Sequence, residues 1–133
     1  MGKPQINTQP PILVRESDAE RVTNLAIAAE DHSPQVALLL LGELNRAKVV
    51  PDAGLSAEIV AMQSTVTFID EASGIERRLQ LVYPHEADIA AGRISILSLV
   101  GAGLLGLRSG QSIMWPDRNG KQRPLRIIEV THC

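Results

Sequence analysis

The sequence predicts an α+β fold, in which an N-terminal antiparallel helical hairpin is followed by a small, mostly antiparallel sheet with one short helix. Two patterns support this prediction. Apolar residues recur at helical spacing between residues 18 and 47, and they alternate at period two in several segments after residue 51. The chain has 133 residues, 44% of them hydrophobic, which is enough for one compact core and makes an ordered, globular protein the expectation.

The first helix is expected from about Asp18 to about Glu30. Ser17 and Glu20 match a capping box, in which the Ser17 hydroxyl accepts from an early helical N–H and Glu20 reaches back to the Ser17 N–H. Behind this box, small and apolar residues form one stripe at helical spacing: Ala19, Val22, Leu25, Ala26 and Ala29. The stripe predicts a helix with one packing face.

The second helix is expected from Pro34 to about Ala47, because Ser33 is a suitable N-cap and proline fits the first helical position. The connection between the helices is short, which predicts that they lie antiparallel. Leu38 and Leu41 point away from the main apolar stripe of this helix. They either pack on the C-terminal part of the chain or form an extra contact face for a partner or for self-association.

Five segments after residue 51 have the alternation and the β-branched content of strands. They span residues 64–69, 77–83, 94–97, 111–115 and 124–130. Turn-forming residues join the first two segments into one hairpin and the last two into another. Near the N-terminus, residues 11–14 form a short apolar run that is expected to be extended.

An apolar run over residues 99–105 is short enough for a two-turn helix that ends at Gly106. Gly101, Gly103 and Gly106 have the spacing of the dinucleotide-binding pattern G-x-G-x-x-G. That pattern binds a pyrophosphate at the start of a long crossover helix, whereas residues 107–110 would end this helix one turn later. We therefore interpret the glycines as points of close backbone packing and expect no cofactor.

The composition argues against several classes of binding site. The aromatic residues are only three, Phe68, Tyr83 and Trp115, which are too few for a base-stacking platform. The net charge of −2 disfavours autonomous binding to duplex DNA. The single cysteine, Cys133, permits no internal disulfide, and no apolar run approaches the ~20 residues of a membrane span. These features predict a soluble, cytoplasmic protein.

Catalytic and metal-binding patterns do not stand out either. His85 and Glu86 begin like a zinc-protease helix, but Ile89 stands where the second histidine is needed. No nucleophile motif accompanies the histidines. We expect no catalytic residue and no metal site, and therefore no independent enzyme. The adjacent acids Glu30 and Asp31, at the predicted hairpin tip, either bind Mg²⁺, present charge to a basic channel or are simply solvated.

Several short segments, taken together in their order and spacing, carry a family resemblance that covers nearly the whole chain. In the C-terminal part they are residues 62–64, 81–84, 94–95, 100–102, 104–106 and 110–113. In the N-terminal part they are residues 11–14, 18–22, 43–44 and 46–47. With these segments the chain resembles the bacterial Gre family of transcription elongation factors, and most closely its short-armed branch, the regulators of nucleoside diphosphate kinase.

The resemblance implies an N-terminal segment with a short antiparallel coiled coil over residues 1–52. It implies a Gre-type C-terminal domain of prolyl-isomerase-like (FKBP-like) fold over residues 53–133. It also implies a bacterial regulator of transcription elongation that docks on RNA polymerase at the rim of the secondary channel. Nucleic acid would be contacted, if at all, only within the polymerase complex.

Arm length separates this chain from the cleavage factors of the family, in which a long coiled coil brings tip carboxylates to the catalytic Mg²⁺. A helix of roughly 13 residues is only about 20 Å long. Glu30 and Asp31 should therefore stop well short of the polymerase active centre. A short-armed protein of this kind is expected to compete with cleavage factors without stimulating cleavage.

The polymerase-facing surface of the family includes the loop before the short helix, which here contains Ser98, Leu99 and Val100. Relatives commonly have a proline where this chain has Leu99, so that an apolar side chain replaces a rigid residue. Val100 could equally be a core residue. Two other functions stay open: a self-associating module that uses Leu38 and Leu41, and a prolyl isomerase of the same fold. The shortage of aromatic residues argues against the isomerase, whose pocket is walled largely by aromatic rings.

Overall fold

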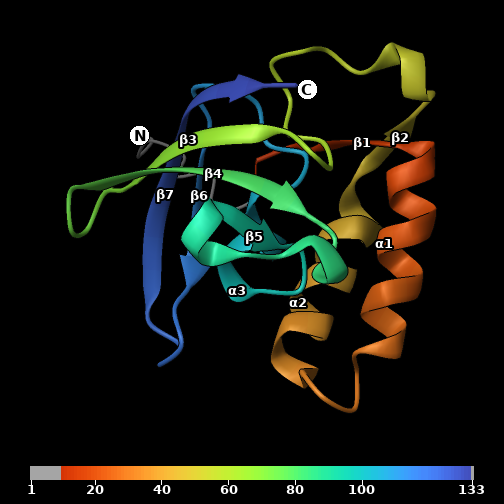
Figure 1. Cartoon of the computed structure of the whole chain (residues 1–133), viewed down its shortest axis with the longest axis horizontal. Helices are drawn as coiled ribbons and strands as arrows, with labels where there is room; N and C mark the ends of the chain where they lie inside the picture. Colours follow the sequence, from red (N-terminus) through yellow and green to blue (C-terminus); the bar gives the residue numbers. More distant parts are fainter. Residues whose placement is uncertain (1–9, 133) are drawn as a thin grey trace, which may run out of the picture.

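The computed structural model describes residues 10–132 and confirms the predicted α+β class (Figure 1). Cys133 lies outside the described residues. The helices are α1 (Glu16–Ala28), α2 (Pro34–Arg46) and α3 (Leu99–Leu104). The strands are β1 (Leu13–Arg15), β2 (Lys48–Val50), β3 (Thr65–Asp70), β4 (Ile75–Val82), β5 (Arg93–Ser95), β6 (Ser112–Pro116) and β7 (Gln122–Thr131). Short 3-10 turns occupy three connections: η1 (Asp52–Gly54), η2 (Pro84–Glu86) and η3 (Ile89–Ala91).

The main sheet has five strands in the order β5-β4-β3-β7-β6, and it curls around α3 (Figure 1). The two predicted hairpins, β3–β4 and β6–β7, are both present as antiparallel pairs. The first and the last strand of this sheet in chain order, β3 and β7, pair antiparallel at its centre. The short strand β5 is the exception, because it pairs in parallel with β4. The sheet is therefore mostly antiparallel, as predicted.

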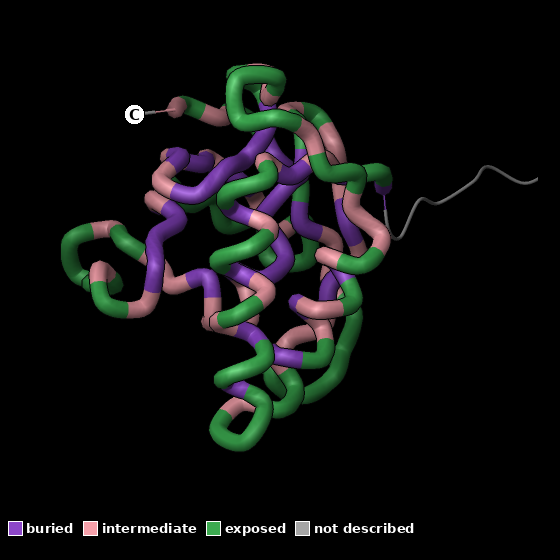
Figure 2. Tube along the Cα trace, turned by 90° about the vertical axis from the view of Figure 1, so that its right-hand side faces the viewer, coloured by how far each residue is buried: buried purple, intermediate pink, exposed green. Residues whose placement is uncertain are grey.

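The two long helices lie side by side and antiparallel, and the strands that flank them form a small parallel pair, β1–β2 (Figure 1). The sequence predicted the extended run before α1 but not its partner. Val22, Ala26 and Leu40 belong to the same buried cluster as Phe68 and Leu81 of the sheet. The hairpin and the sheet thus share one hydrophobic core, seen as the buried interior of the tube in Figure 2.

The start of α1 differs from the prediction, and the expected Ser17–Glu20 capping box is wrong. The helix begins at Glu16, and its N-cap is Arg15, which makes no side-chain cap bond. The Ser17 N–H donates instead to a carboxylate oxygen of Asp52, 3.0 Å away in η1. This bond is the first of the causes that hold the pKa of Asp52 below its ordinary value. A distant acid satisfies the helix N-terminus, so the local hydroxyl is not needed.

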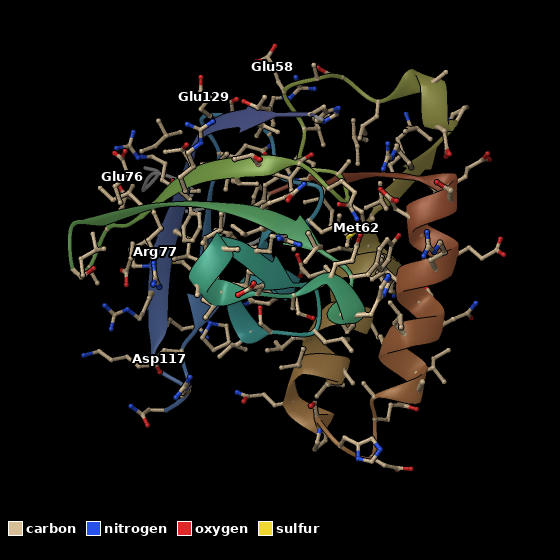
Figure 3. All side chains as sticks on the ribbon, viewed as in Figure 1. Glu58, Met62, Glu76, Arg77, Asp117 and Glu129 are labelled. Atoms are coloured by element: carbon tan, nitrogen blue, oxygen red, sulfur yellow. The ribbon has the colours of Figure 1, made fainter. Side chains whose placement is uncertain are left out.

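An ion pair with a buried acid lies at the start of α1, and hydrogen bonds join it to the loop before β3. Asp18 is only 3% exposed, and its carboxylate accepts from Arg15 Nε at 2.9 Å and from the Met62 N–H at 3.2 Å. Figure 3 shows Met62 between the sheet and α1. The Arg15 guanidinium also donates to the Met62 carbonyl. These bonds fix the direction of the hairpin relative to the sheet.

The three glycines of the G-x-G-x-x-G pattern are points of close packing, as predicted. A Cβ on Gly101 would overlap the Ser95 carbonyl oxygen. A Cβ on Gly103 would lie 2.8 Å from the Trp115 ring, and one on Gly106 would lie 2.8 Å from Ile12. Gly106 also has φ of +86°, which side-chain-bearing residues rarely adopt. Packing therefore accounts for all three glycines.

Candidate functional site

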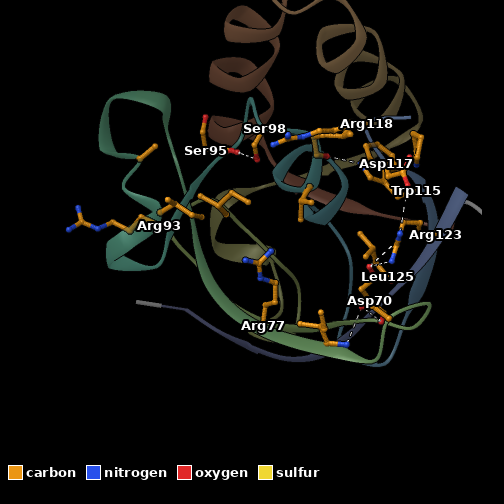
Figure 4. A pocket seen from close by; sticks show the side chains of 18 of the residues that line it. Asp70, Arg77, Arg93, Ser95, Ser98, Trp115, Asp117, Arg118, Arg123 and Leu125 are labelled. Carbon is orange, nitrogen blue, oxygen red and sulfur yellow. Dashed lines mark hydrogen bonds and ion pairs between the residues drawn. The ribbon is translucent and has the colours of Figure 1, made fainter. Parts of the chain in front are cut away.

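The loop expected to dock on the polymerase lies in an open groove of about 840 Å³ (Figure 4). Ser98, Leu99 and Val100 form one side of this groove, where the chain enters α3. The other sides come from the start of β4, from β5 and from the turn between β6 and β7. The structure thus brings the three sequence-predicted loop residues together in one concave surface.

Two serines hold the backbone of the loop in place. The Ser98 hydroxyl donates to the Ser95 carbonyl at 2.7 Å and accepts from the Gly101 N–H at 3.0 Å, so Ser98 is the N-cap of α3. The Ser95 hydroxyl accepts from the Leu97 N–H at 3.0 Å. Ser98 therefore shapes the loop, and the side chains left for contact with a partner are those of Leu99 and Val100.

Trp115 supports the loop from behind. Its indole N–H donates to the Leu99 carbonyl at 2.7 Å, and its ring packs on Gly103 of α3. The side chain is only 4% exposed, so Trp115 belongs to the core. The bond to Leu99 joins residues 16 positions apart, and the sequence held no signal for it.

The groove has an apolar rim that is open to solvent. Ile75, at the start of β4, is 59% exposed, and Ile89 in η3 is 62% exposed. Leu99 and Val100 are each partly exposed on the opposite side. Exposed isoleucines on two facing elements give the groove a surface that a partner's apolar side chain can cover.

The charged residues of the groove fall into two groups. Arg123 is paired with Asp70 at 2.8 Å and lies 3.7 Å from Asp117. Partial burial opposes the ionisation of Asp70, but the Arg123 guanidinium and the Ala72 N–H outweigh it and hold the pKa of its carboxyl below the ordinary value. The second group, which makes no ion pair within residues 10–132, consists of Arg77, Asp88, Arg93 and Arg118.

The predicted hairpin tip is where the sequence placed it. Glu30 and Asp31 are exposed in the turn between α1 and α2, at the end of the hairpin that projects from the sheet (Figures 1 and 2). Neither acid lines the groove. Within the described part of the chain, no three His, Cys, Asp or Glu side chains gather to hold a metal ion.

The two leucines of the extra face expected on α2 differ in their exposure. Leu38 is 75% exposed, whereas Leu41 is partly buried against the core cluster. Both line a shallow hollow of about 530 Å³ on the hairpin, together with Thr23 and Gly42. In residues 10–132, no helix is both long enough and apolar enough to cross a bilayer.

Comparison with known protein families finds two matches that follow each other along the chain. Residues 55–132 match the family model described as "Transcription elongation factor, GreA/GreB, C-term". Residues 10–50 match the model described as "Rnk N-terminus". The groove and its loop lie in the first of these segments, and the helical hairpin lies in the second.

Individual relatives agree with these matches. The chain is 32% identical over 125 residues to the regulator of nucleoside diphosphate kinase of Escherichia coli K12, covering 94% of this chain and 92% of that protein. It is 41% identical over 88 residues to the transcription elongation factor GreA of Azorhizobium caulinodans, covering 66% of this chain and 55% of GreA.

A solved structure extends the similarity to three dimensions. The transcription elongation factor GreA/GreB from Nitrosomonas europaea superposes with a TM-score of 0.71 at 40% sequence identity. The superposition covers 91% of this chain and 99% of that one. The likeness therefore includes both the helical hairpin and the curled sheet.

Proposed function

Because this chain belongs to the GreA/GreB family of transcription elongation factors, we propose that it is a bacterial transcription regulator that binds RNA polymerase through its groove. The observation that supports this site is the loop of Ser98, Leu99 and Val100, which is held rigidly at the groove by the Trp115 bond to Leu99. A preorganised apolar loop loses little conformational entropy when it binds. We place the binding surface at the rim of the secondary channel and the protein in the cytoplasm.

We propose that the regulator acts by occupying the polymerase, without catalysis of its own. In this proposal the sheet and α3 form a prolyl-isomerase-like (FKBP-like) domain over residues 53–133. Trp115 is the one aromatic residue among the described groove-lining residues, and its N–H already bonds Leu99. This composition suits docking better than an isomerase pocket walled by aromatic rings.

We propose further that the helices in residues 1–52 form a short coiled-coil arm that competes with cleavage factors but does not stimulate cleavage. Helices α1 and α2 have 13 residues each. At 1.5 Å per residue each helix is about 20 Å long. Glu30 and Asp31, at the tip of the arm, would then not reach the active centre of the polymerase. The protein would contact nucleic acid only within the polymerase complex.

Binding to bacterial core RNA polymerase tests this proposal directly. The wild-type chain should bind at micromolar concentration or below, and Leu99→Asp should weaken the affinity at least about tenfold, because a charge would enter the apolar contact. Leu38→Asp is the control, since Leu38 is equally apolar and lies on the hairpin outside the groove, where it is more exposed than Leu99. No binding of the wild-type chain at micromolar concentration would overturn the proposal.

Two functional assays test the role of the arm. The chain should displace a cleavage factor from the polymerase, and it should not stimulate transcript cleavage in stalled complexes. Glu30→Gln combined with Asp31→Asn should leave the displacement unchanged, because the acids are not part of the groove. Clear stimulation of cleavage by the wild-type chain, lost in this double variant, would contradict the argument from arm length.

Self-association is the second candidate function, and one observation favours it. Leu38 is 75% exposed in a hollow on the outside of the hairpin. A sedimentation series over concentration distinguishes this function, since a dimer built on that hollow should dissociate in the Leu38→Asp variant.

A further inference from the structure

The groove contains arginines that form no ion pair with an acid within residues 10–132. We infer that it binds an acidic segment of a partner chain, with an apolar side chain against Leu99 and Ile89 and carboxylates paired to Arg77 and Arg118. The identity of the partner as RNA polymerase rests on the proposed function. The chemistry of the bound segment rests on the groove itself.

The charge of the groove is opposite in sign to that of the whole chain. Four arginines and three aspartates line it, whereas the chain as a whole has a net charge of −2. The local excess of positive charge is small, so what matters is which of these groups are already paired. An acidic partner gains only from the arginines that are free to reach it.

The acids of the groove are largely engaged by the protein. Asp70 is held by Arg123 and by the Ala72 N–H. Asp117 accepts from the Asn119 and Lys121 N–H groups, at 2.8 and 3.0 Å, and lies near Arg123. These contacts neutralise Arg123 and leave the carboxylates Asp70 and Asp117 with satisfied partners.

The third acid that lines the groove is Asp88, and its backbone pairs with that of Arg93. Figure 4 shows the Arg93 side chain pointing outward, away from the groove. Asp88 and Arg93 carry opposite charges, so that together they add no net charge to the lining of the groove.

Arg77 points into the groove from β4 (Figure 4). It pairs across the sheet with Phe68, and residues that pair in this way lie on the same face of a sheet. Phe68 is buried on the concave face, so Arg77 projects from that face beyond the core. Figure 3 shows the neighbouring Glu76 on the other side of the strand.

Arg118 approaches from the opposite side, in the turn between β6 and β7. The two backbone bonds to Asp117 give this turn a defined shape, so the backbone position of Arg118 is set before any partner binds. Its side chain extends toward the Ser98 end of the groove (Figure 4). Two arginines on separate elements suit two carboxylates spaced along a segment better than one compact phosphate.

The apolar part of the groove selects a peptide over a nucleic acid. Ile75 and Ile89 are exposed at the rim, and Trp115 presents no free ring for a base to stack on. Single-stranded nucleic acid would need such rings in addition to basic residues. An extended segment that alternates apolar and acidic residues matches both properties of this surface.

Charge reversals measured against core RNA polymerase test the inference. Arg77→Glu and Arg118→Glu should each weaken the affinity about tenfold, and the double variant more, because each reversal replaces attraction with repulsion. Arg78→Glu is the matched control: Arg78 is exposed on the same strand, does not line the groove and pairs with Thr67 on the opposite face. It should bind within about twofold of wild type.

The same variants separate this inference from the proposed function. If Arg77→Glu and Arg118→Glu bind like wild type while Leu99→Asp does not, the acidic segment is wrong and the docking site stands. If the wild-type chain does not bind polymerase at all, the proposed function fails, and synthetic peptides decide the chemistry of the groove.

For the peptide experiment we would use fluorescent peptides of about twelve residues. One alternates leucine and glutamate, a second has glutamine for glutamate, and a third has lysine. The glutamate peptide should bind at least about tenfold more tightly than the other two, with amide shifts at Arg77 and Arg118. Equal binding of the three peptides, or tighter binding of an oligothymidine of similar length, would overturn the inference. Self-association that Arg77→Glu abolishes would overturn it too, by making a second copy the occupant.

Discussion

The arginines at the junction between hairpin and sheet each have an acid built in beside them, whereas among the described arginines of the groove only Arg123 has one. At the junction, Arg15 pairs with Asp18 at 2.9 Å, and Arg46 of α2 pairs with Glu43 at 2.6 Å. Both acids are almost fully buried. In the groove, Arg77 and Arg118 are exposed, and no ion pair is formed by either within residues 10–132.

This difference separates a structural role from an available one. The hydrogen bonding that Arg15 donates to Asp18 is the main reason that the pKa of Arg15 lies above its ordinary value, and the pair would be costly to break because its acid is buried. A groove arginine without a partner acid makes no ion pair in the folded chain, so a change of its charge should not lower the stability. Substitutions at the junction should therefore change stability, and those in the groove should change binding.

Removal of the buried acid should have the largest effect. Asp18→Ala leaves Arg15 and the Met62 N–H without their acceptor, which should lower the free energy of unfolding by about 2–4 kcal/mol. Urea denaturation measures this change. Asp31→Ala at the exposed tip is the control and should stay within about 0.5 kcal/mol of wild type. Equal losses in the two variants would remove the distinction between junction and surface.

A Cβ at the back of the groove should have the next largest effect. Gly103→Ala places a methyl group 2.8 Å from the Trp115 ring, which should cost about 1–3 kcal/mol and shift the tryptophan fluorescence. Gly42→Ala in α2 is the matched control, because nothing lies within 4 Å of its new Cβ. That variant should gain about 0.5–1 kcal/mol from helix propensity. A neutral Gly103→Ala variant would show that the indole can move without cost.

The first residue of α3 should accept a proline. Leu99 is the first helical position, where the N–H has no intrahelical partner, and its carbonyl remains available to Trp115. Leu99→Pro should therefore raise the stability by up to about 1 kcal/mol, measured by thermal unfolding. Leu104→Pro, at the end of the same helix and fully buried, is the destabilising control. A loss of stability in Leu99→Pro would mean that the loop has a different backbone requirement.

Acid should weaken both regions slightly. The pKa values of Asp52, Asp70 and Glu86 all lie below their ordinary values of 3.8, 3.8 and 4.5. Carboxyls of this kind add stability above the unfolded-state pKa, and the contribution is lost as the pH falls through the lower folded-state pKa.

The melting temperature should therefore decrease below about pH 4.5, and Asp52→Asn and Asp70→Asn should each make the decrease shallower. The effect is small because Asp52 is exposed and Asp70 and Glu86 are only partly buried. An unchanged pH profile in both variants would exclude them as its source.

Local patterns explain how far the sequence predicted this fold. Alternation over β3 and β4, and the turn residues between β6 and β7, depend on neighbours a few positions apart, and both hairpins are present. The capping box at Ser17 is also a local pattern, but it is not present. The Ser17 N–H, which Glu20 was expected to bind, donates instead to Asp52, 35 positions away in the sequence. The parallel β1–β2 pair was also missed, since strand pairing over such a separation has no local signal.

The sequence by itself predicted the three helices, the two strand hairpins, the packing role of the glycines and the family resemblance, and it suggested Ser98, Leu99 and Val100 as the loop that we propose for docking. Only the tertiary structure decided which arginines have partners. It brought the Asp18 carboxylate to the Met62 N–H, and it brought Arg123 to Asp70, which is 53 positions away in the sequence. It left Arg77 and Arg118 without an ion pair within residues 10–132. The physical reason is that periodicity and turn chemistry act between near neighbours, whereas the pairing of a charge depends on which distant segment the core brings beside it.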